Sequence, residues 1–278
     1  SDPALAPPEV TDAAQWQAHQ EAALARLRAL TFRNIPADCT PGEGNVRQDG
    51  GSREGVSYAT YAFNTHDGLT LRMKTMRHAD APRPTPTVAY AIQSEAKSTF
   101  AGGGASRPAI STPLATAGVE VRNTGVTSVG PGYLWTLRRT YPLLGQTLPE
   151  RQVYDLLAGV ALLRRDSVTG PVALFGQGHT APLAVYAALL DAKVSEVILA
   201  DLPESHENPE TPEFLGILRI GDLPHNLALL WPRPITFVGA MPPAYDYTRK
   251  VYEKLGTAER IRVVGSPREW QPAANAGP

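Results

Sequence analysis

Apolar residues recur at helical spacing in two long segments of the chain. In residues 11–30 they fall on one face of a helix that Thr11 or Asp12 is placed to cap. In Pro149–Arg165 the apolar face is longer and consists of Val153, Leu156, Leu157, Val160 and Leu163. Both segments are therefore predicted to be amphipathic helices that pack on a domain surface. Further helices are predicted over Ala181–Asp191 and near Tyr247–Leu255.

Alternating apolar and polar residues predict an antiparallel start to a β-sheet. Val56–Asn64 and Leu69–Arg77 both alternate, and the turn His66-Asp67-Gly68 separates them. Asp-Gly between two such runs is a strong hairpin signal, because the turn needs residues that tolerate positive φ. The segment before them, Pro36–Glu54, is polar and rich in turn residues, which predicts a loop.

From residue 85 onward, short apolar strands alternate with helices. The predicted strands are Thr85–Ile92, Val119–Arg122, Pro171–Phe175, Val194–Ala200, Ile235–Gly239 and Ile261–Val264. Leu114–Ala117 is predicted to be a short helical or turn element, and Ala101–Arg107 a loop. This rhythm is typical of an α/β fold with a parallel sheet covered on both faces. We expect a mixed, mostly parallel sheet of about eight strands. Residues 56–278 would form one domain, with residues 1–55 as a helix and lead-in packed on it.

Composition excludes several classes of protein. The 278 residues include 26 Lys+Arg and 27 Asp+Glu, a formal charge of −1, which does not favour a nucleic-acid or polybasic membrane-surface partner. No uninterrupted apolar run reaches the ~18 residues of a membrane span. Cys39 is the single cysteine, so no intrachain disulfide forms, and its surroundings indicate an inert loop thiol. The Ser1 start fits a domain excised from a longer chain, so a catalytic domain of that chain is one expected partner.

The turn Phe175–Ala181 is the most distinctive candidate for a functional site. It joins the buried strand Pro171–Phe175 to the apolar helix Ala181–Asp191 through the residues Gly176-Gln177-Gly178-His179-Thr180. Such a sharp bend needs small residues and a positive φ, both of which glycine provides. Ligands of open α/β sheets bind at the carboxyl ends of the strands, which is where this turn lies.

At this turn the sequence resembles the α/β-hydrolase superfamily, especially carbohydrate esterases of the acetylxylan-esterase type and prolyl-oligopeptidase-like hydrolases. The likeness rests on Val172–Asp201, on Thr211–Gly239 and on the Pro232-Arg233-Pro234 that leads into a strand, and covers roughly residues 50–265. It implies an α/β-hydrolase-like three-layer sandwich and an ester hydrolase. It also implies a secreted or periplasmic protein and a carbohydrate ligand.

The same resemblance places glycine where the family has its nucleophile. The family's turn reads G-x-S-x-G, which falls on Gly176-Gln177-Gly178-His179-Thr180, so Gly178 stands at the serine position and Thr180 at the last glycine. Glycine relieves roughly 1–3 kcal/mol of backbone strain at a positive φ. It also removes the oxygen that would form an acyl-enzyme.

The sequence offers only weak candidates for the acid and for the base of the family's triad. The acid would follow the strand that ends near Gly239, where Asp246 is the nearest candidate, although it is also a helix cap. The family's histidine would follow Val264, and the remaining tail contains none. His179 and His206 are weak substitutes. Gln93 and Ser94, after the third strand, are expected to line the pocket with Gly176, Gln177, Gly178 and His179.

Three functions therefore stay open at the level of the sequence. The leading one is a catalytically silent hydrolase-like domain that serves as a scaffold or carbohydrate-binding part of a larger esterase, with no cofactor and no metal. The second is an active ester hydrolase in which His179 or His206 acts with Asp246 on water. The third is a dinucleotide-binding domain, because Gly176-x-Gly178-x-x-Ala181 follows a strand, opens a helix and precedes Asp201 by about 20–25 residues.

Overall fold

The first helix begins where the sequence offers a cap. The computed structural model describes residues 8–42, 46–92 and 114–273, and α1 spans Ala13–Arg26. The carboxylate of Asp12 accepts a hydrogen bond from the backbone N–H of Gln15 at 2.9 Å, which satisfies one of the free donors of the first turn. One π-helical turn, Leu27–Thr31, continues α1. The predicted helix over residues 11–30 is thus confirmed with slightly shorter bounds.

Three antiparallel strands form one side of the sheet. These are β1 (Val46–Arg53), β2 (Val56–Asn64) and β3 (Thr70–His78). The predicted hairpin is confirmed: Asn64 pairs with Thr70, and Gly68 adopts φ +82° between them. The expectation of a loop over Pro36–Glu54 is wrong for its second half, because β1 pairs with β2 from Val56 to Ala62. The sequence gives no strand signal here, because β1 consists mainly of polar residues and of Gly50-Gly51. Its pairing with β2 is made by backbone groups, which do not depend on these side chains.

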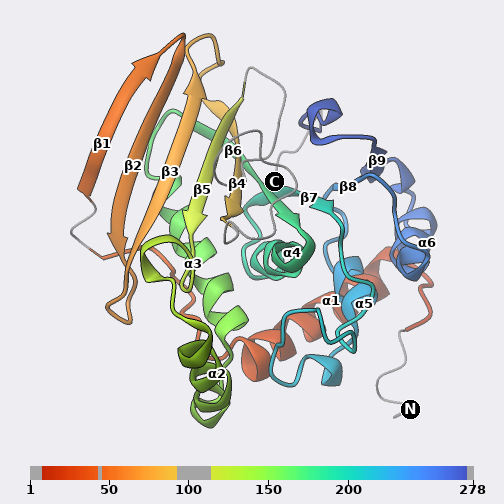
Figure 1. Cartoon of the computed structure of the whole chain (residues 1–278). Helices are drawn as coiled ribbons and strands as arrows, with labels where there is room; N and C mark the ends of the chain where they lie inside the picture. Colours follow the sequence, from red (N-terminus) through yellow and green to blue (C-terminus); the bar gives the residue numbers. More distant parts are fainter. Residues whose placement is uncertain (1–7, 43–45, 93–113, 274–278) are drawn as a thin grey trace.

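Six further strands complete a nine-stranded sheet in the described part of the chain. They are β4 (Thr85–Ala91), β5 (Ala115–Glu120), β6 (Thr169–Gln177), β7 (Val194–Ala200), β8 (Ile235–Val238) and β9 (Ile261–Val264). The order across the sheet is β1-β2-β3-β5-β4-β6-β7-β8-β9 (Figure 1). The strands β5, β4, β6, β7, β8 and β9 run parallel to one another, whereas β5 pairs antiparallel with β3 on its other side. The mostly parallel sheet with an antiparallel start is confirmed. The short helical element expected at Leu114–Ala117 is wrong, because residues 115–117 belong to β5.

Five more α-helices connect or cover these strands. They are α2 (Pro131–Thr140), α3 (Leu148–Leu163), α4 (Ala181–Leu190), α5 (Leu223–Ala228) and α6 (Asp246–Lys254). Short 3₁₀ turns lie at Gly125–Thr127, Tyr141–Leu144, Gly178–Thr180, Ile217–Arg219, Pro243–Tyr245, Ala258–Arg260 and Pro267–Glu269. Helix α3 begins with a capping box in which Thr147 and Glu150 satisfy each other's backbone N–H groups. Helices α3, α4 and α6 are confirmed, whereas α2 and α5 were not predicted.

Strand alternation sorts the core into two clusters on opposite faces of the sheet. In β7, Val197 and Leu199 belong to a large cluster, and Ile198 and Ala200 to a small one. The large cluster also contains buried residues of α1, α3, α4, α5 and α6. The small one is completed by Trp270, near the end of the described chain. Neighbouring strand residues point to opposite faces, so β4, β6, β7 and β8 each contribute to both clusters.

Trp270 is held in place by a buried carboxylate. Glu196, on β7, accepts hydrogen bonds from Trp270 Nε1 at 3.1 Å, from Arg262 Nη2 at 2.5 Å and from the backbone N–H of Ala273 at 3.2 Å. Burial of a charge is costly unless such partners surround it. These contacts therefore fix the C-terminal segment to the small cluster.

Candidate functional site

The strand connections place a crevice between the ends of β4 and β6. From β4 the chain goes to β5 on one side, and from β6 it goes to β7 on the other side. At such a reversal the two loops diverge, and ligands of open α/β sheets bind there. The turn after β6 is the one that the sequence analysis singled out. Gln93 and Ser94, expected on the β4 side, lie outside the described residues.

Gly176 and Gly178 serve different purposes in the turn after β6. A Cβ at Gly176 would lie 2.5 Å from the Cα of Ala181 and 2.7 Å from the carbonyl oxygen of Thr180, so helix α4 approaches too closely for a side chain. Gly178 instead has φ +52°, and a Cβ there would meet nothing within 4 Å. The turn therefore requires glycine for packing at Gly176 and for backbone conformation at Gly178.

Thr180 closes the turn with its hydroxyl group. Its Oγ1 accepts from the backbone N–H of Gln177 at 3.0 Å and donates to the carbonyl of Gln177 at 3.1 Å. The side-chain amide of Gln177 donates to Asp201 at 2.9 Å, which ties the end of β6 to the residue that follows β7. Asp201 itself adopts φ +48°. The hydroxyl group of Thr180 thus stabilises the turn.

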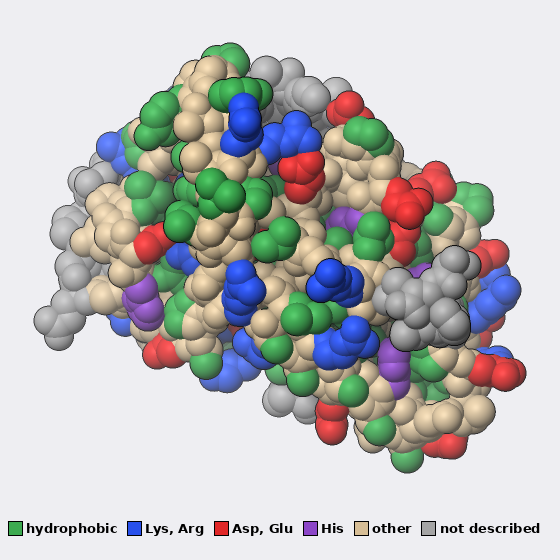
Figure 2. Space-filling view, turned by 90° about the horizontal axis from the view of Figure 1, so that it is seen from below, with side chains coloured by type: hydrophobic (Ala, Val, Ile, Leu, Met, Phe, Trp, Pro, Cys, Tyr) green, Lys and Arg blue, Asp and Glu red, His purple; other side chains and the backbone are tan. Residues whose placement is uncertain are grey.

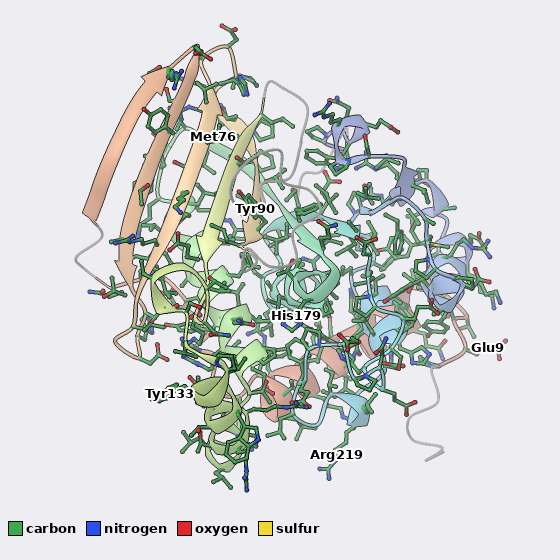
Figure 3. The ribbon with its side chains drawn as sticks, viewed as in Figure 1. Glu9, Met76, Tyr90, Tyr133, His179 and Arg219 are labelled. Carbon is green, nitrogen blue, oxygen red and sulfur yellow. The ribbon has the colours of Figure 1, made fainter. Side chains whose placement is uncertain are left out.

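Two adjoining cavities open above this turn. One, of about 500 Å³, is lined by Gln177, Gly178, His179 and Thr180, and by residues that follow β5 and β7. The other, of about 540 Å³, lies against α2 and the start of α3. Both are lined by Asn123, Gln152, His179 and Glu210, so these four residues stand where the cavities meet. His179 lies below the end of β6 on the side of α2 (Figure 3).

A buried ionic network shapes the wall opposite the turn. Arg122 follows β5 and donates to Asp155 of α3 through Nε at 2.9 Å and Nη2 at 2.7 Å, and to Asp67 through Nη1 at 3.0 Å. Arg151 also donates to Asp67, and the two arginines hold the pKa of Asp67 well below its usual range. This network fixes the turn at Asn123, whose φ of +63° directs the chain along the rim of both cavities.

The charged residues that line the cavities are mostly acidic. Asp201 and Glu210 line the cavity beside Gly178, and no Lys or Arg does so among the described residues. In the other cavity the single Lys or Arg among the described lining residues is Arg138, which is paired with Glu213 through Nε at 3.0 Å. Carboxylates therefore outnumber Lys and Arg in the described lining of this site.

His206 lies away from these cavities, within an aromatic cluster under α4. Its Nε2 is 2.5 Å from the hydroxyl of Tyr186, and its ring stacks on Tyr186 and meets the edge of Phe214. Burial lowers the pKa of His206 to about 4, so the ring is neutral at physiological pH. Of the six histidines, all of which the structure describes, His179 is the one that lines the two cavities.

Asp246 is the first residue of α6 and is exposed. It forms an ion pair with Arg249 one turn later, at 3.1 Å, and it does not line either cavity. The structure thus places Gln177, Gly178 and His179 at the cavity beside the turn, whereas Gly176 packs against α4 and lines neither cavity, and His206 and Asp246 lie elsewhere. No group of three or more His, Cys, Asp or Glu within the described residues is arranged to hold a metal ion.

Sequence reasoning missed three residues where the cavities meet. Asn123 lies three residues after the end of β5, a position that points to a ligand edge, and Gln152 directly precedes the apolar run of α3. Glu210 has no comparable signal, since it lies in the long connection between β7 and α5. The missed residues come from three separate segments, which a sequence does not place side by side.

The surface around α2 is apolar and basic. Tyr133, Trp135, Leu143 and Leu144 are exposed, and the guanidinium of Arg139 lies 4.5 Å from the centre of the Trp135 ring. Seen from the side of α2, hydrophobic and basic side chains are interspersed on this face (Figure 2). No helix in the described segments has the length and apolar character that crossing a bilayer requires.

Solved structures of several esterases superpose on this chain. A putative acetyl xylan esterase from Bacteroides fragilis matches with a TM-score of 0.73 and 15% identity, over 90% of this chain and 75% of its own. A glucuronoyl esterase from Solibacter usitatus matches with a TM-score of 0.65 and 13% identity, over 94% and 91%. An acetyl xylan esterase from Paenibacillus sp. R4 matches with a TM-score of 0.53 and 13% identity, over 92% and 89%. This chain has the α/β-hydrolase fold.

At this low identity the likeness establishes the fold alone. No family model and no curated protein sequence matches the chain. The α/β-hydrolase fold accounts for the sheet order, for the sharp turn between β6 and α4 and for the crevice above it. The structural resemblance to carbohydrate esterases is clear, and the residues of the site have to carry any argument about activity.

Proposed function

We propose that this chain is a catalytically silent α/β-hydrolase-like domain that binds carbohydrate or serves as a scaffold within a larger carbohydrate esterase. One observation carries the proposal: Gly178, with φ +52° and open space beside it, occupies the apex of the turn between β6 and α4. In a G-x-S-x-G turn this apex carries the nucleophile. Glycine supplies the backbone conformation and no attacking oxygen.

The surroundings of Gly178 support the same conclusion. A serine nucleophile needs a histidine within hydrogen-bond reach, and that histidine needs an orienting acid. His206 is engaged with Tyr186, Asp246 is paired with Arg249, and His179 belongs to the turn itself. An active hydrolase that uses these residues would need His206 or Asp246 to move into the cavity, so this alternative has less support.

The dinucleotide alternative also has less support than its sequence pattern suggests. Asp201 does follow β7, the neighbour of β6, as the ribose-binding acid of such a domain would. However, its carboxylate already accepts a hydrogen bond from Gln177. The cavity beside Gly178 has no Lys or Arg among its described lining residues to meet a pyrophosphate, and it does present Asp201 and Glu210. The pattern remains a prediction that a binding assay tests.

Hydrolysis of a short-chain aryl acetate tests the silent state. We expect the protein to release the phenol no faster than a heat-denatured sample does. Gly178→Ser is expected to remain inactive as well, because a serine without a general base stays protonated, and Gly178→Ala is its matched control. Robust turnover by the unmodified protein that disappears in a His179 or His206 variant would overturn the proposal.

Ligand-dependent melting separates the remaining functions. Xylo-oligosaccharides are expected to raise the melting temperature, whereas NAD and NADP are expected to leave it unchanged. The reverse pattern would favour the dinucleotide-binding domain.

Strong rescue of esterase activity by Gly178→Ser alone would show that a histidine already acts at the turn.

A further inference from the structure

Gln152 carries a buried hydrogen-bond acceptor that has no partner among the described residues. It lies on α3, is 6% exposed, and its side-chain Oε1 is not bonded to any group in the described part of the chain. An unsatisfied acceptor of this kind is costly, and a hydroxyl group of a ligand would satisfy it. Gln152 lines both cavities above the turn, at the place where they meet.

The orientation of this amide is fixed by its other end. Gln152 Nε2 donates to the carbonyl of Arg122 at 2.9 Å. A carbonyl accepts only from the NH₂ group, so the amide cannot be reversed without losing that bond. Arg122 is itself held by Asp155 and Asp67, so the acceptor stands on a rigid wall.

The neighbours of Gln152 define the chemistry of the ligand. Asp201 and Glu210 add carboxylate oxygens, and the described lining includes no Lys or Arg other than the paired Arg138, beside the ring of His179. A carboxylate or phosphate ligand would meet like charge in such a site. Apolar walls, among them Leu134, Leu183 and Tyr141, favour a ligand with carbon faces as well as donors.

We propose that Gln152 anchors an uncharged ligand rich in hydroxyl groups, which donates a hydrogen bond to Oε1 where the two cavities join. The proposal rests on the proposed function and gives it a specificity: a neutral sugar is accepted and a uronic acid is rejected. Gln152 acts here as a binding residue. It performs no chemistry.

Calorimetric titration with three probes tests this assignment. Xylotriose is expected to bind the unmodified protein, while trigalacturonate, which has similar hydroxyl groups and added carboxylates, is expected not to bind. Gln152→Met keeps the length of the side chain and removes the amide, and it is expected to weaken xylotriose binding about ten-fold or more. Preferential binding of trigalacturonate or of 1,4-diaminobutane would overturn the proposal.

A matched control separates ligand binding from general stability. Gln20 is half-buried and also donates to backbone carbonyl groups through its amide, those of Leu229 and Trp231, but it lies outside both cavities. Gln20→Met is therefore expected to leave the affinity for xylotriose unchanged. Equal affinity in Gln152→Met and the unmodified protein would refute the role of Gln152 while leaving a carbohydrate-binding function intact.

A structure of the complex gives a readout that needs no variant. With xylotriose bound, a hydroxyl group is expected within hydrogen-bond distance of Gln152 Oε1. Sugar density elsewhere on the surface, or the absence of xylotriose binding to the unmodified protein, would overturn the inference. Esterase turnover by the unmodified protein would instead count against the proposed function.

Discussion

The turns after β6 and β8 differ in what holds them, although both contain a glycine of positive φ. After β6, helix α4 packs directly on Gly176, and Thr180 bonds the turn to the end of the strand. After β8, Gly239 has φ +90°, open space beside it and one backbone bond to Val264. The first turn is thus determined by packing, and the second mainly by its backbone.

This difference explains why the turn after β6 keeps its shape without a nucleophile at residue 178. Gly176 is required because Ala181 lies against it, whatever residue stands at 178. The resemblance to hydrolases implies an acid after β8, where Asp246 is exposed and paired with Arg249. A closely packed turn retains its form without catalysis, whereas an open turn imposes no position on an acidic side chain.

The largest expected effect is that of Gly176→Ala. The added methyl group would lie 2.5 Å from the Cα of Ala181, and backbone atoms do not yield as a flexible side chain does. We expect a loss of about 3 kcal/mol or more in the free energy of unfolding. Urea denaturation measures it, with Gly132→Ala as the control, since a Cβ there meets nothing within 4 Å. A native-like stability of Gly176→Ala would mean that α4 is not packed on the turn.

Acidification is expected to weaken the cluster beneath α4. The pKa of His206 is lowered from 6.5 to about 4 in the folded protein, so between these values the unfolded chain binds more protons. Stability therefore rises with pH over this window and is lost as the pH falls from about 6.5 to 4, by roughly 2–3 kcal/mol.

Thermal melting of His206→Gln across the same window tests this assignment. The variant is expected to show a shallower dependence on pH, because its side chain does not titrate. An unchanged slope would assign the acid sensitivity to other groups. Asp222 near His206 is the first to examine, since its pKa is lowered by the backbone hydrogen bonds that it accepts.

Serine at the two glycines of positive φ is expected to have a smaller effect. Neither Gly178→Ser nor Gly239→Ser introduces a clash. Each variant therefore lowers the free energy of unfolding only by the cost of placing serine in a left-handed conformation, about 1–2 kcal/mol. Melting curves should show similar decreases of a few degrees for both variants. A much larger decrease for Gly178→Ser would show that the space beside Gly178 is occupied in solution.

The smallest expected effect is that of Asp246→Asn. Its ion pair with Arg249 is exposed, and pairs of this kind contribute less than about 0.5 kcal/mol. Chemical denaturation should not distinguish the variant from the unmodified protein. A loss above 1 kcal/mol would indicate that the open turn after β8 depends on Asp246 after all.

Much of the fold was predictable because the pattern of apolar residues in the sequence indicates which strands and helices are buried. Val194–Ala200 and Ile261–Val264 are strands with the predicted bounds, since their apolar runs end at turn residues. The strand β1 was missed because its backbone pairs while its sequence is polar. Residues 115–117 were misassigned because two of the three are alanine, which carries little strand signal.

The sequence by itself determined the α/β architecture and the turn at Gly178, because periodicity and glycine spacing are local properties. It also supplied Gln177, Gly178 and His179 as residues of one site, since they are neighbours in the chain. Only the tertiary structure decided that Gln152, Asn123 and Glu210 meet above this turn and that His206 and Asp246 do not. Their positions follow from how α3, β5 and the loop after β7 pack together, which spacing along the chain does not encode.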